Sequence, residues 1–480
     1  MEGVLADRSN TEDIWRVADG KAPVFFELSD RIWDHPELNY QEFYAAAEHR
    51  SMLEREGFRV TAGVAGLPTA LIGEAGEGGP VVAILGEYDA LPGLSQAAGV
   101  ATEQALQQGG YGHGCGHNML GSASLLAAAS VKEWLAAHGV PGRVRYYGCP
   151  AEEGGSAKGF MVRAGAFDDV DVAICWHPAA FTGVNKPISL ACVEFEFTFH
   201  GRAAHAAAAP HLGRSALDAV ELMNIGVNYM REHMPSSARV HYAIIDAGGI
   251  APNVVQAKAT VRQLIRARTL GEMWDLVRRV RAIADGAALM TETKVVAKQL
   301  SGDANLVGNR PLEEAMYANL QRLGGPGFDD ADRAFAGEIQ KTFSQDDIRA
   351  SYGRFGLVPR DGEVLSEDIY PLDYVADLFV GSTDVGTVSW VVPTVQCRVA
   401  CYAVGTPGHS WQLVAQGRSP AAHKGLALAA KAMAATATDV LADPALLRAA
   451  KAEFEKFRAA HPFQNPITDE VEPPLDMAAH

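Results

Sequence analysis

Residues that can bind metal ions lie close together in the segment His113-Gly-Cys-Gly-His117. This segment presents one thiol and two imidazoles on a glycine-flanked loop that runs into a predicted helix. Glycine lets a backbone fold tightly around an ion, and the start of a helix lowers the pKa of a thiol toward the thiolate that a metal requires. The segment therefore indicates a metal site; the alternative interpretation is a packed glycine loop with incidental histidines.

Two adjacent carboxylates, Glu152 and Glu153, stand in a second glycine-bounded segment. Adjacent side chains on such a loop point in different directions, so one can bind a metal while its neighbour faces a bound water. The alternative is a solvated turn.

His177 and His409 each follow an apolar run, where a lone histidine more often makes a structural hydrogen bond. Together these features predict ligands for two divalent cations and one carboxylate left to move a proton, the chemistry of a metal-dependent amide hydrolase.

Short apolar runs predict the buried strands that must position these residues. Strands that alternate with helices predict an α/β fold with a mostly parallel sheet. Sites in such sheets gather outside the carboxyl ends of the strands, so we expect the candidate ligands to meet there, with Asp89 at the same edge. The strands are expected at residues 81–85, 144–148, 170–176 and 397–403, and helices at 119–138, 157–164 and, as the final one, 419–440.

The middle of the chain has a different spacing of apolar and polar residues. Residues 193–200 alternate strictly between apolar and polar types, which indicates a strand with one buried face. The expected order of elements from there to residue 300 is β-α-β-β-α-β, the ferredoxin-like order. His177 and His409 can share a metal cluster only if the first and last parts of the chain form one domain. We therefore predict a catalytic domain of residues 1–187 and 304–480 with an inserted α+β domain at 188–303.

Composition narrows the classes of protein to consider. The 480 residues favour two domains. The net charge of 41 − 58 = −17 argues against a nucleic-acid surface, which needs clustered Lys and Arg. Residues 1–15 lack the pattern of a signal peptide, and the Ala-rich run at 425–435 is too short to span a bilayer. We expect a soluble, cytoplasmic protein with free cysteines, no membrane partner and a loosely held tail after Pro462.

Several motifs resemble the M20 metallopeptidase and amidohydrolase family, and the similarity runs over nearly the whole chain. They lie at residues 85–92, 113–118, 150–154, 177–178, 201–205 and 405–409. Residues 381–386, 389–390 and 409–418 fit a subgroup that hydrolyses an aromatic acyl–glutamate amide. The resemblance implies a metallohydrolase fold, with the inserted domain acting in dimerisation or as a lid.

The resemblance also implies roles for individual residues. Glu152 would be the general base, Asp89 and His113 would support the ligands from behind, and Asn118 stands where many relatives have aspartate, which leaves its role open. Two divalent ions, Mn²⁺ or Zn²⁺, would be bound by Cys115, His117, Glu153, His177 and His409.

Three residues of the predicted inserted domain gain roles in the same way. His205 would act in catalysis and Asn253 in substrate binding, both at the site of a neighbouring subunit. Arg266 would bind the substrate α-carboxylate, for which a guanidinium fork is suited. The alternative for each residue is a purely structural role. His205 would then be part of a loop of small residues, and Arg266 would cap the edge of a strand. These roles imply a homodimer, or a heteromer with a related subunit.

The substrate implied first is p-aminobenzoyl-glutamate, split into p-aminobenzoate and glutamate. One alternative is another N-acyl amino acid, dipeptide or conjugate, such as an indole-acyl aspartate or a β-alanyl amide. A different class of function is a partner subunit that needs a second chain for activity. Lost ligands would mark such a subunit, and here the set is complete.

Overall fold

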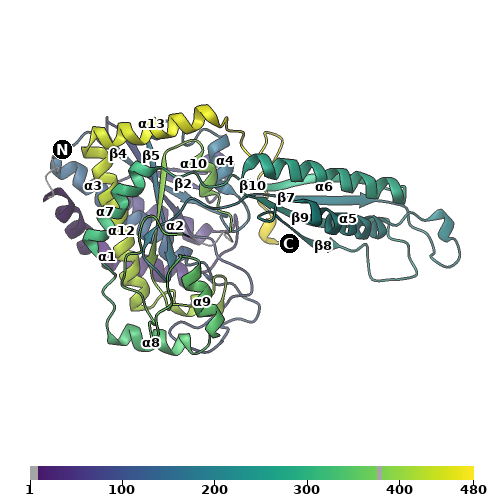
Figure 1. Ribbon diagram of the computed structural model, residues 1–480, viewed down its shortest axis with the longest axis horizontal. Coiled ribbons are helices and arrows are strands. Elements are labelled where there is room, and N and C mark those ends of the chain that lie inside the picture. The colour runs from purple at the N-terminus through teal and green to yellow at the C-terminus, as the bar shows by residue number, and fades with distance from the viewer. Residues whose placement is uncertain (1–8, 376–380, 480) are drawn as a thin grey trace.

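The computed structural model describes residues 9–375 and 381–479 and contains two separate sheets (Figure 1). Residues 1–8, on which the signal-peptide prediction partly rests, lie outside the described part. The first sheet has seven strands. Their order is β1 (Arg59–Ala62), β2 (Leu71–Glu77), β4 (Gly142–Cys149), β3 (Val81–Glu87), β5 (Val172–Ala179), β11 (Thr394–Ala400) and β6 (Gly183–Val184).

This first sheet is mixed. Its four central strands, β4, β3, β5 and β11, run parallel, whereas β1, β2 and β6 pair antiparallel at the edges. The prediction of a mostly parallel sheet is therefore correct for the centre only. The physical reason lies in the connection from β1 to β2, residues 63–70, which is shorter than the crossover that parallel neighbours need. The buried centre explains why β3 is apolar on both faces.

Helix α3 (His117–His138) is the central helix of this layer. It packs against β3, α1 (Ser9–Asp34) and α12 (Pro420–Ala442), and most of its residues are buried. Small alanines on α3 and α12 allow close approach, so these helices share one apolar core with the sheet. Apart from the two helices on the second sheet, the other α-helices are α2 (Phe43–Arg55), α4 (Ala157–Arg163), α7 (Arg310–Leu323), α8 (Asp330–Gln340), α9 (Gln345–Gly353), α10 (Val385–Ser389), α11 (Trp411–Gln416) and α13 (Pro444–Ala460). The described 3-10 turns are η1 (Val64–Gly66), η2 (Pro210–Leu212), η3 (Arg231–His233) and η4 (Met477–Ala479).

Helix α12 is long and apolar enough, by length and composition, to cross a membrane. Its 23 residues correct the expectation that this segment is too short. In the structure, however, 78% of its most apolar window is buried against other parts of the chain. Helix α12 thus packs as a core helix of a globular protein does.

The second sheet extends away from the first (Figure 1). It is antiparallel throughout, and helices α5 (Ala216–Met230) and α6 (Leu270–Thr291) pack on it around a core of its own. Along the chain the order is β-α-β-β-α-β. Across the sheet the order is β10 (Lys294–Asp303), β7 (Ala191–His200), β9 (Lys258–Ala267) and β8 (Arg239–Asp246).

The segment after Pro462 packs onto the rest of the molecule, so the expectation of a loose tail is wrong. Ile467 is 1% exposed and joins the core beneath α4. The Arg163 guanidinium donates to the carbonyl oxygens of Thr468 and Val471 at 2.6 and 2.7 Å. The prolines and acids of this segment suggested a loose tail, but the apolar side chains of Ile467 and Val471 pack into the core.

Candidate metal centre

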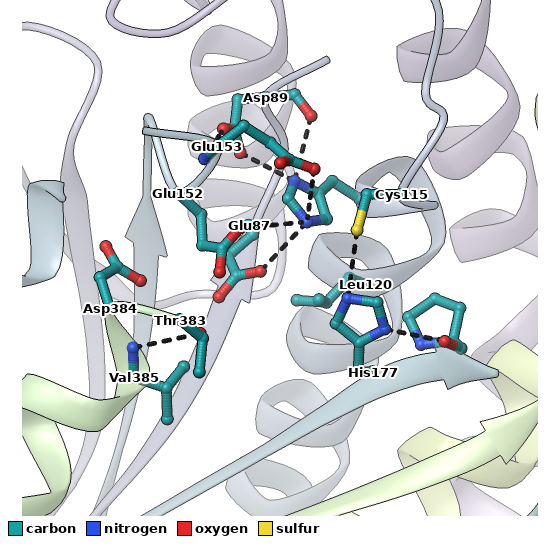
Figure 2. A network of polar contacts seen from close by, with 12 residues as sticks. Glu87, Asp89, Cys115, Leu120, Glu152, Glu153, His177, Thr383, Asp384 and Val385 are labelled. Atoms are coloured by element: carbon teal, nitrogen blue, oxygen red, sulfur yellow. Dashed lines mark hydrogen bonds and ion pairs between the residues drawn. The ribbon is translucent and has the colours of Figure 1, made fainter. Parts of the chain in front are cut away.

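The candidate ligands converge at the carboxyl ends of the parallel strands, as such sheets favour. Figure 2 shows Cys115, Glu153 and His177 of this set. Cys115 stands on the loop before α3, and His117 is the first residue of that helix. Glu153 follows β4, and His177 lies near the end of β5. His409 follows β11 in a left-handed conformation with φ 56°, and its backbone N–H donates to the Gly114 carbonyl at 2.9 Å. That hydrogen bond ties the two ligand-bearing loops together.

Cys115 belongs to two groups of potential ligand atoms. Its Sγ lies 3.3 Å from Nε2 of His177. The first group joins Cys115 to His117 and His177, and the second joins it to Glu153 and His409; within each group the ligand atoms lie within 4.8 Å of one another. The sulfur of Cys115 is therefore common to both groups, each of which could hold a cation.

Two buried atoms at this place lack a hydrogen-bond partner among the described residues, namely Nε2 of His117 and Oε1 of Glu153. A buried polar atom without a partner is costly, and a cation in each of the two ligand groups would satisfy these atoms. Contacts with Cys115 and Glu153 also raise the pKa of His409 to about 10. Anionic groups are thus crowded here, so the residues fit a site for positive ions.

Asp89 supports the ligands from behind. Its Oδ1 lies 2.8 Å from Nδ1 of His117, and its Oδ2 accepts the backbone N–H of Glu153 at 2.8 Å. Burial by itself would raise the pKa of Asp89, but the imidazole and the N–H lower it overall. The carboxylate therefore directs Nε2 of His117 toward the centre and fixes the turn that carries Glu153.

Glu152 lies at the mouth of this cluster. Its Oε2 is 3.9 Å from Nε2 of His117, and it forms a third group of potential ligands with His117 and Glu87. Burial, and then the charges of Glu87 and Glu153, raise the pKa of Glu152 well above its usual value. A carboxylate in such surroundings accepts a proton more readily than an exposed one, as a general base must.

A buried ion network behind Glu152 was missed by the sequence reasoning. Nζ of Lys158, wholly buried, lies 2.7 Å from Oε1 of Glu87 and 2.6 Å from Oδ1 of Asp384. The other oxygen of Glu87 is 3.4 Å from Nε2 of His117. Figure 2 shows Glu87 and Asp384 on the same side of the cluster. Glu87 could have been found from its place at the end of β3, two residues before Asp89.

His113 and Asn118 point away from the centre. Nε2 of His113 lies 3.2 Å from the Ile32 carbonyl oxygen, and burial lowers the pKa of His113 to about 4. Nδ2 of Asn118 donates to Oγ of Ser29 at 3.0 Å and to the Gly417 carbonyl at 2.9 Å. Both side chains tie the ligand loop and α3 to neighbouring segments. An aspartate at 118 would lose those two donated bonds.

A cavity of about 280 Å³ opens beside the cluster and is lined by Cys115, Glu152, Glu153, His177 and His409. Arg266, at the end of β9 nearest the first sheet, also lines this cavity. A guanidinium so placed is available to a carboxylate on a molecule in the cavity.

His205 and Asn253 lie at the far end of the second sheet. Both are exposed, and the Ala206 backbone N–H donates to the Asn253 carbonyl at 2.9 Å. Strand β9 begins close by at Lys258 and reaches Arg266 only near its other end. Eight steps along a strand span roughly 27 Å. The chain by itself therefore brings Arg266 to the cluster but leaves His205 and Asn253 far from it.

Comparison with known proteins agrees with this architecture. Residues 83–470 match the description "Peptidase family M20/M25/M40". The chain belongs to this hydrolase family, and the resemblance drawn from its motifs is confirmed.

Particular relatives follow from the same comparison. Over 459 residues the chain is 48% identical to the B subunit of p-aminobenzoyl-glutamate hydrolase from Escherichia coli, covering 94% of this chain and 95% of that protein. It is 31% identical to the Xaa-Arg dipeptidase of Mus musculus, covering 89% and 88%. The A subunit of the Escherichia coli hydrolase is 29% identical over 49% of this chain and 55% of its own length.

Among solved structures, a dinuclear metal-binding peptidase of the M20 family from Bacillus subtilis has the same fold. Its TM-score is 0.54 at 18% identity, covering 88% of this chain and 99% of that one. An aminobenzoyl-glutamate utilization protein from Klebsiella pneumoniae has a TM-score of 0.58 at 18% identity, covering 90% and 99%.

Proposed function

We propose that this chain hydrolyses the amide bond of an N-acyl amino acid, with p-aminobenzoyl-glutamate as its first substrate. The observation that carries the proposal is a shared thiolate, Cys115, between two groups of ligands in a cavity that also holds the free carboxylate Glu152. The relative that is 48% identical supports the choice of substrate.

The residues would hold two divalent ions. Cys115, His117 and His177 would surround one ion, and Cys115, Glu153 and His409 the other. Thiolate and imidazole suit zinc, while the carboxylate makes manganese acceptable. When bound, such ions lower the pKa of a water toward ~7 and polarise an amide carbonyl.

Glu152 would move the proton in this reaction. It takes a proton from the attacking water at its Oε2 and later delivers that proton to the departing amine. Its raised pKa suits both steps, because a carboxylate that holds a proton more strongly than usual is a better base toward the water. Arg266 would hold the α-carboxylate of the substrate and so orient the amide toward Glu152.

His205 and Asn253 would act at the site of a second copy of the chain, which accounts for their distance from the cluster in their own chain. The exposed edge strand β8 supports a dimer. Tyr242, Ile244 and Ile245 on this strand are 42%, 47% and 48% exposed, and an apolar edge strand favours pairing with another copy. In this proposal the second sheet is an inserted dimerisation or lid domain. A cytoplasmic location fits, because Cys115 must stay reduced to bind metal.

A substrate panel tests the proposal. The purified chain is stripped of metal, reloaded with manganese or zinc, and given p-aminobenzoyl-glutamate, an indole-acyl aspartate, a β-alanyl dipeptide and a dipeptide ending in arginine. We expect the highest kcat/KM for p-aminobenzoyl-glutamate. Preference for the arginine dipeptide would favour the activity named for the mouse relative. Activity that appears only when a related protein is added would favour the role of a partner that needs a second chain.

A further inference from the structure

Three arginines line the cavity beside the candidate metal centre: Arg266, Arg354 and Arg398. Within residues 9–375 and 381–479, no carboxylate lies within 4.0 Å of any of these guanidinium groups. Some other arginines of the fold, such as Arg145 and Arg310, are paired with acids. Arg266 already has a role in the proposed function, but the other two have none.

Arg398 is held in place by neighbours on the sheet. It lies on β11 opposite His177 of β5, and its Nε donates to Oδ1 of Asn185 at 2.8 Å. Asn185 in turn donates to Oε1 of Gln396 at 2.6 Å. Gln396 and Arg398 are two residues apart on a strand, so they share a face, and both line the cavity. The Asn185 contact occupies Nε and leaves the terminal Nη nitrogens for a ligand.

Arg354 reaches the same cavity from another element. It follows helix α9 directly, between Tyr352 and Phe355, whose rings are buried in an aromatic cluster with Phe181. These anchored neighbours fix the backbone on both sides of Arg354. The positive charge of Arg398, and then burial, lower the pKa of Arg354. Two guanidinium groups therefore repel each other across the cavity.

The described lining of the cavity carries more basic than acidic side chains. Of the lining residues that the structure describes, only Glu152 and Glu153 carry carboxylates, and both belong to the candidate metal centre. Lys186 adds a further cation to the same lining, with its ammonium 5.2 Å from the ring centre of Tyr374. In a protein of net charge −17, this described lining thus carries four basic side chains against two carboxylates. Such a lining suits an anionic group on a ligand.

We propose that Arg354 and Arg398 form a subsite for the side-chain carboxylate of the amino acid that leaves. The inference rests on the proposed function and deepens it: the enzyme selects conjugates of dicarboxylic amino acids. Arg266 holds the α-carboxylate, and the Arg354–Arg398 pair holds the second one. A neutral side chain leaves the two guanidinium groups uncompensated, and a basic one adds to their repulsion.

Two substrates that differ only in this charge test the subsite. We expect the metal-loaded enzyme to hydrolyse p-aminobenzoyl-glutamate with a kcat/KM at least about 10-fold above that for p-aminobenzoyl-glutamine, as charge-assisted hydrogen bonds allow. In the double variant Arg354→Gln/Arg398→Gln this ratio should fall below about 3. A ratio that survives the double substitution overturns the assignment.

Two further variants separate the subsite from general damage. Arg266→Gln should lower kcat/KM for both substrates by similar factors, because both carry the α-carboxylate. Arg349→Gln alters an exposed arginine on α9 that pairs with Asp346, and it should leave the ratio unchanged. If Arg266→Gln removes the preference and the double variant does not, then Arg266 is the side-chain subsite and the proposal is wrong.

The binding of reaction products tests the Arg354–Arg398 subsite without any need for catalytic turnover. Calorimetry with L-glutamate and L-glutamine should show that the metal-loaded wild type binds glutamate at least about 10-fold more tightly, and that the double variant loses the difference. Equal affinity in the wild type overturns the subsite even if the hydrolase activity is present. Preference for glutamate in a protein that cleaves neither conjugate would support the subsite while contradicting the proposed function.

Discussion

Asp89 and His117 are joined by a 2.8 Å contact between Oδ1 and Nδ1, while the second oxygen of the same carboxylate accepts the Glu153 backbone N–H. One side chain therefore positions two candidate ligands from different elements. We expect Asp89→Ala to weaken metal affinity by about 10- to 100-fold. Metal content after dialysis against graded free zinc measures this. Asp346→Ala, at a side chain that is 91% exposed, is the control and should bind as the wild type does.

Glu152 is predicted to serve proton transfer more than metal binding. Glu152→Gln keeps the shape of the side chain but cannot take a proton, so we expect kcat to fall at least about 10²-fold. Metal content should stay at the wild-type value. Near-native turnover would remove Glu152 from this role, and loss of metal would show that it is a ligand.

His205 is predicted to complete the site of a second chain. His205→Ala and Glu152→Gln proteins should each be nearly inactive alone. Unfolded together and refolded as a mixture, they should regain about a quarter of wild-type activity, because half of the dimers are mixed and each mixed dimer has one intact site. A mixture as inactive as its parts would place His205 outside the neighbouring site.

Lys158 is predicted to stabilise the fold around Glu87 and Asp384. Lys158→Met leaves both carboxylates buried without a cation, which we expect to cost about 3–5 kcal/mol in the free energy of unfolding. Lys341→Met breaks an exposed ion pair with Glu338 and should cost less than about 1 kcal/mol. Denaturant titration of both variants measures the difference, and equal costs would contradict the prediction.

Metal removal is predicted to destabilise the protein as well as inactivate it. The ions would bind the folded chain, which brings Glu152, Glu153 and Cys115 together, but not the unfolded chain. Their removal therefore lowers the free energy of unfolding. We expect a lower Tm after chelation and its recovery on adding zinc or manganese, measured by calorimetry. An unchanged Tm would argue against ions at this cluster.

Local pattern was enough to predict much of the first sheet. A continuous apolar run predicted β3, because a strand buried on both faces carries few polar residues. Apolar runs interrupted by one charged residue predicted β4 and β5. The Ala-rich pattern predicted α3 and α12 to within a few residues. Helix α12 was expected to be the last, yet α13 follows after Asp443, which caps it through the Ala445 N–H. The Asp-Pro pair at 443–444 was the signal for that new helix.

Contacts between distant segments were harder to predict. Lys158 looks like any lysine of an amphipathic helix, and only the fold shows that it faces Glu87 inside the protein. Arg354 ends a short helix and Arg398 sits between two buried residues of β11, so no spacing in the chain indicates that they share a cavity. Such charges meet through tertiary packing, which periodicity does not encode.

The spread of the candidate ligands along the chain has a consequence for biosynthesis. Cys115 and His409 are separated by 409 − 115 = 294 residues, and His409 lies on the loop after the last strand of the first sheet. A ribosome must finish most of the polypeptide before the final ligand can reach the others. Loading of both ion positions thus belongs to a late stage of folding, because a nascent chain that has not reached His409 lacks one member of the second ligand group.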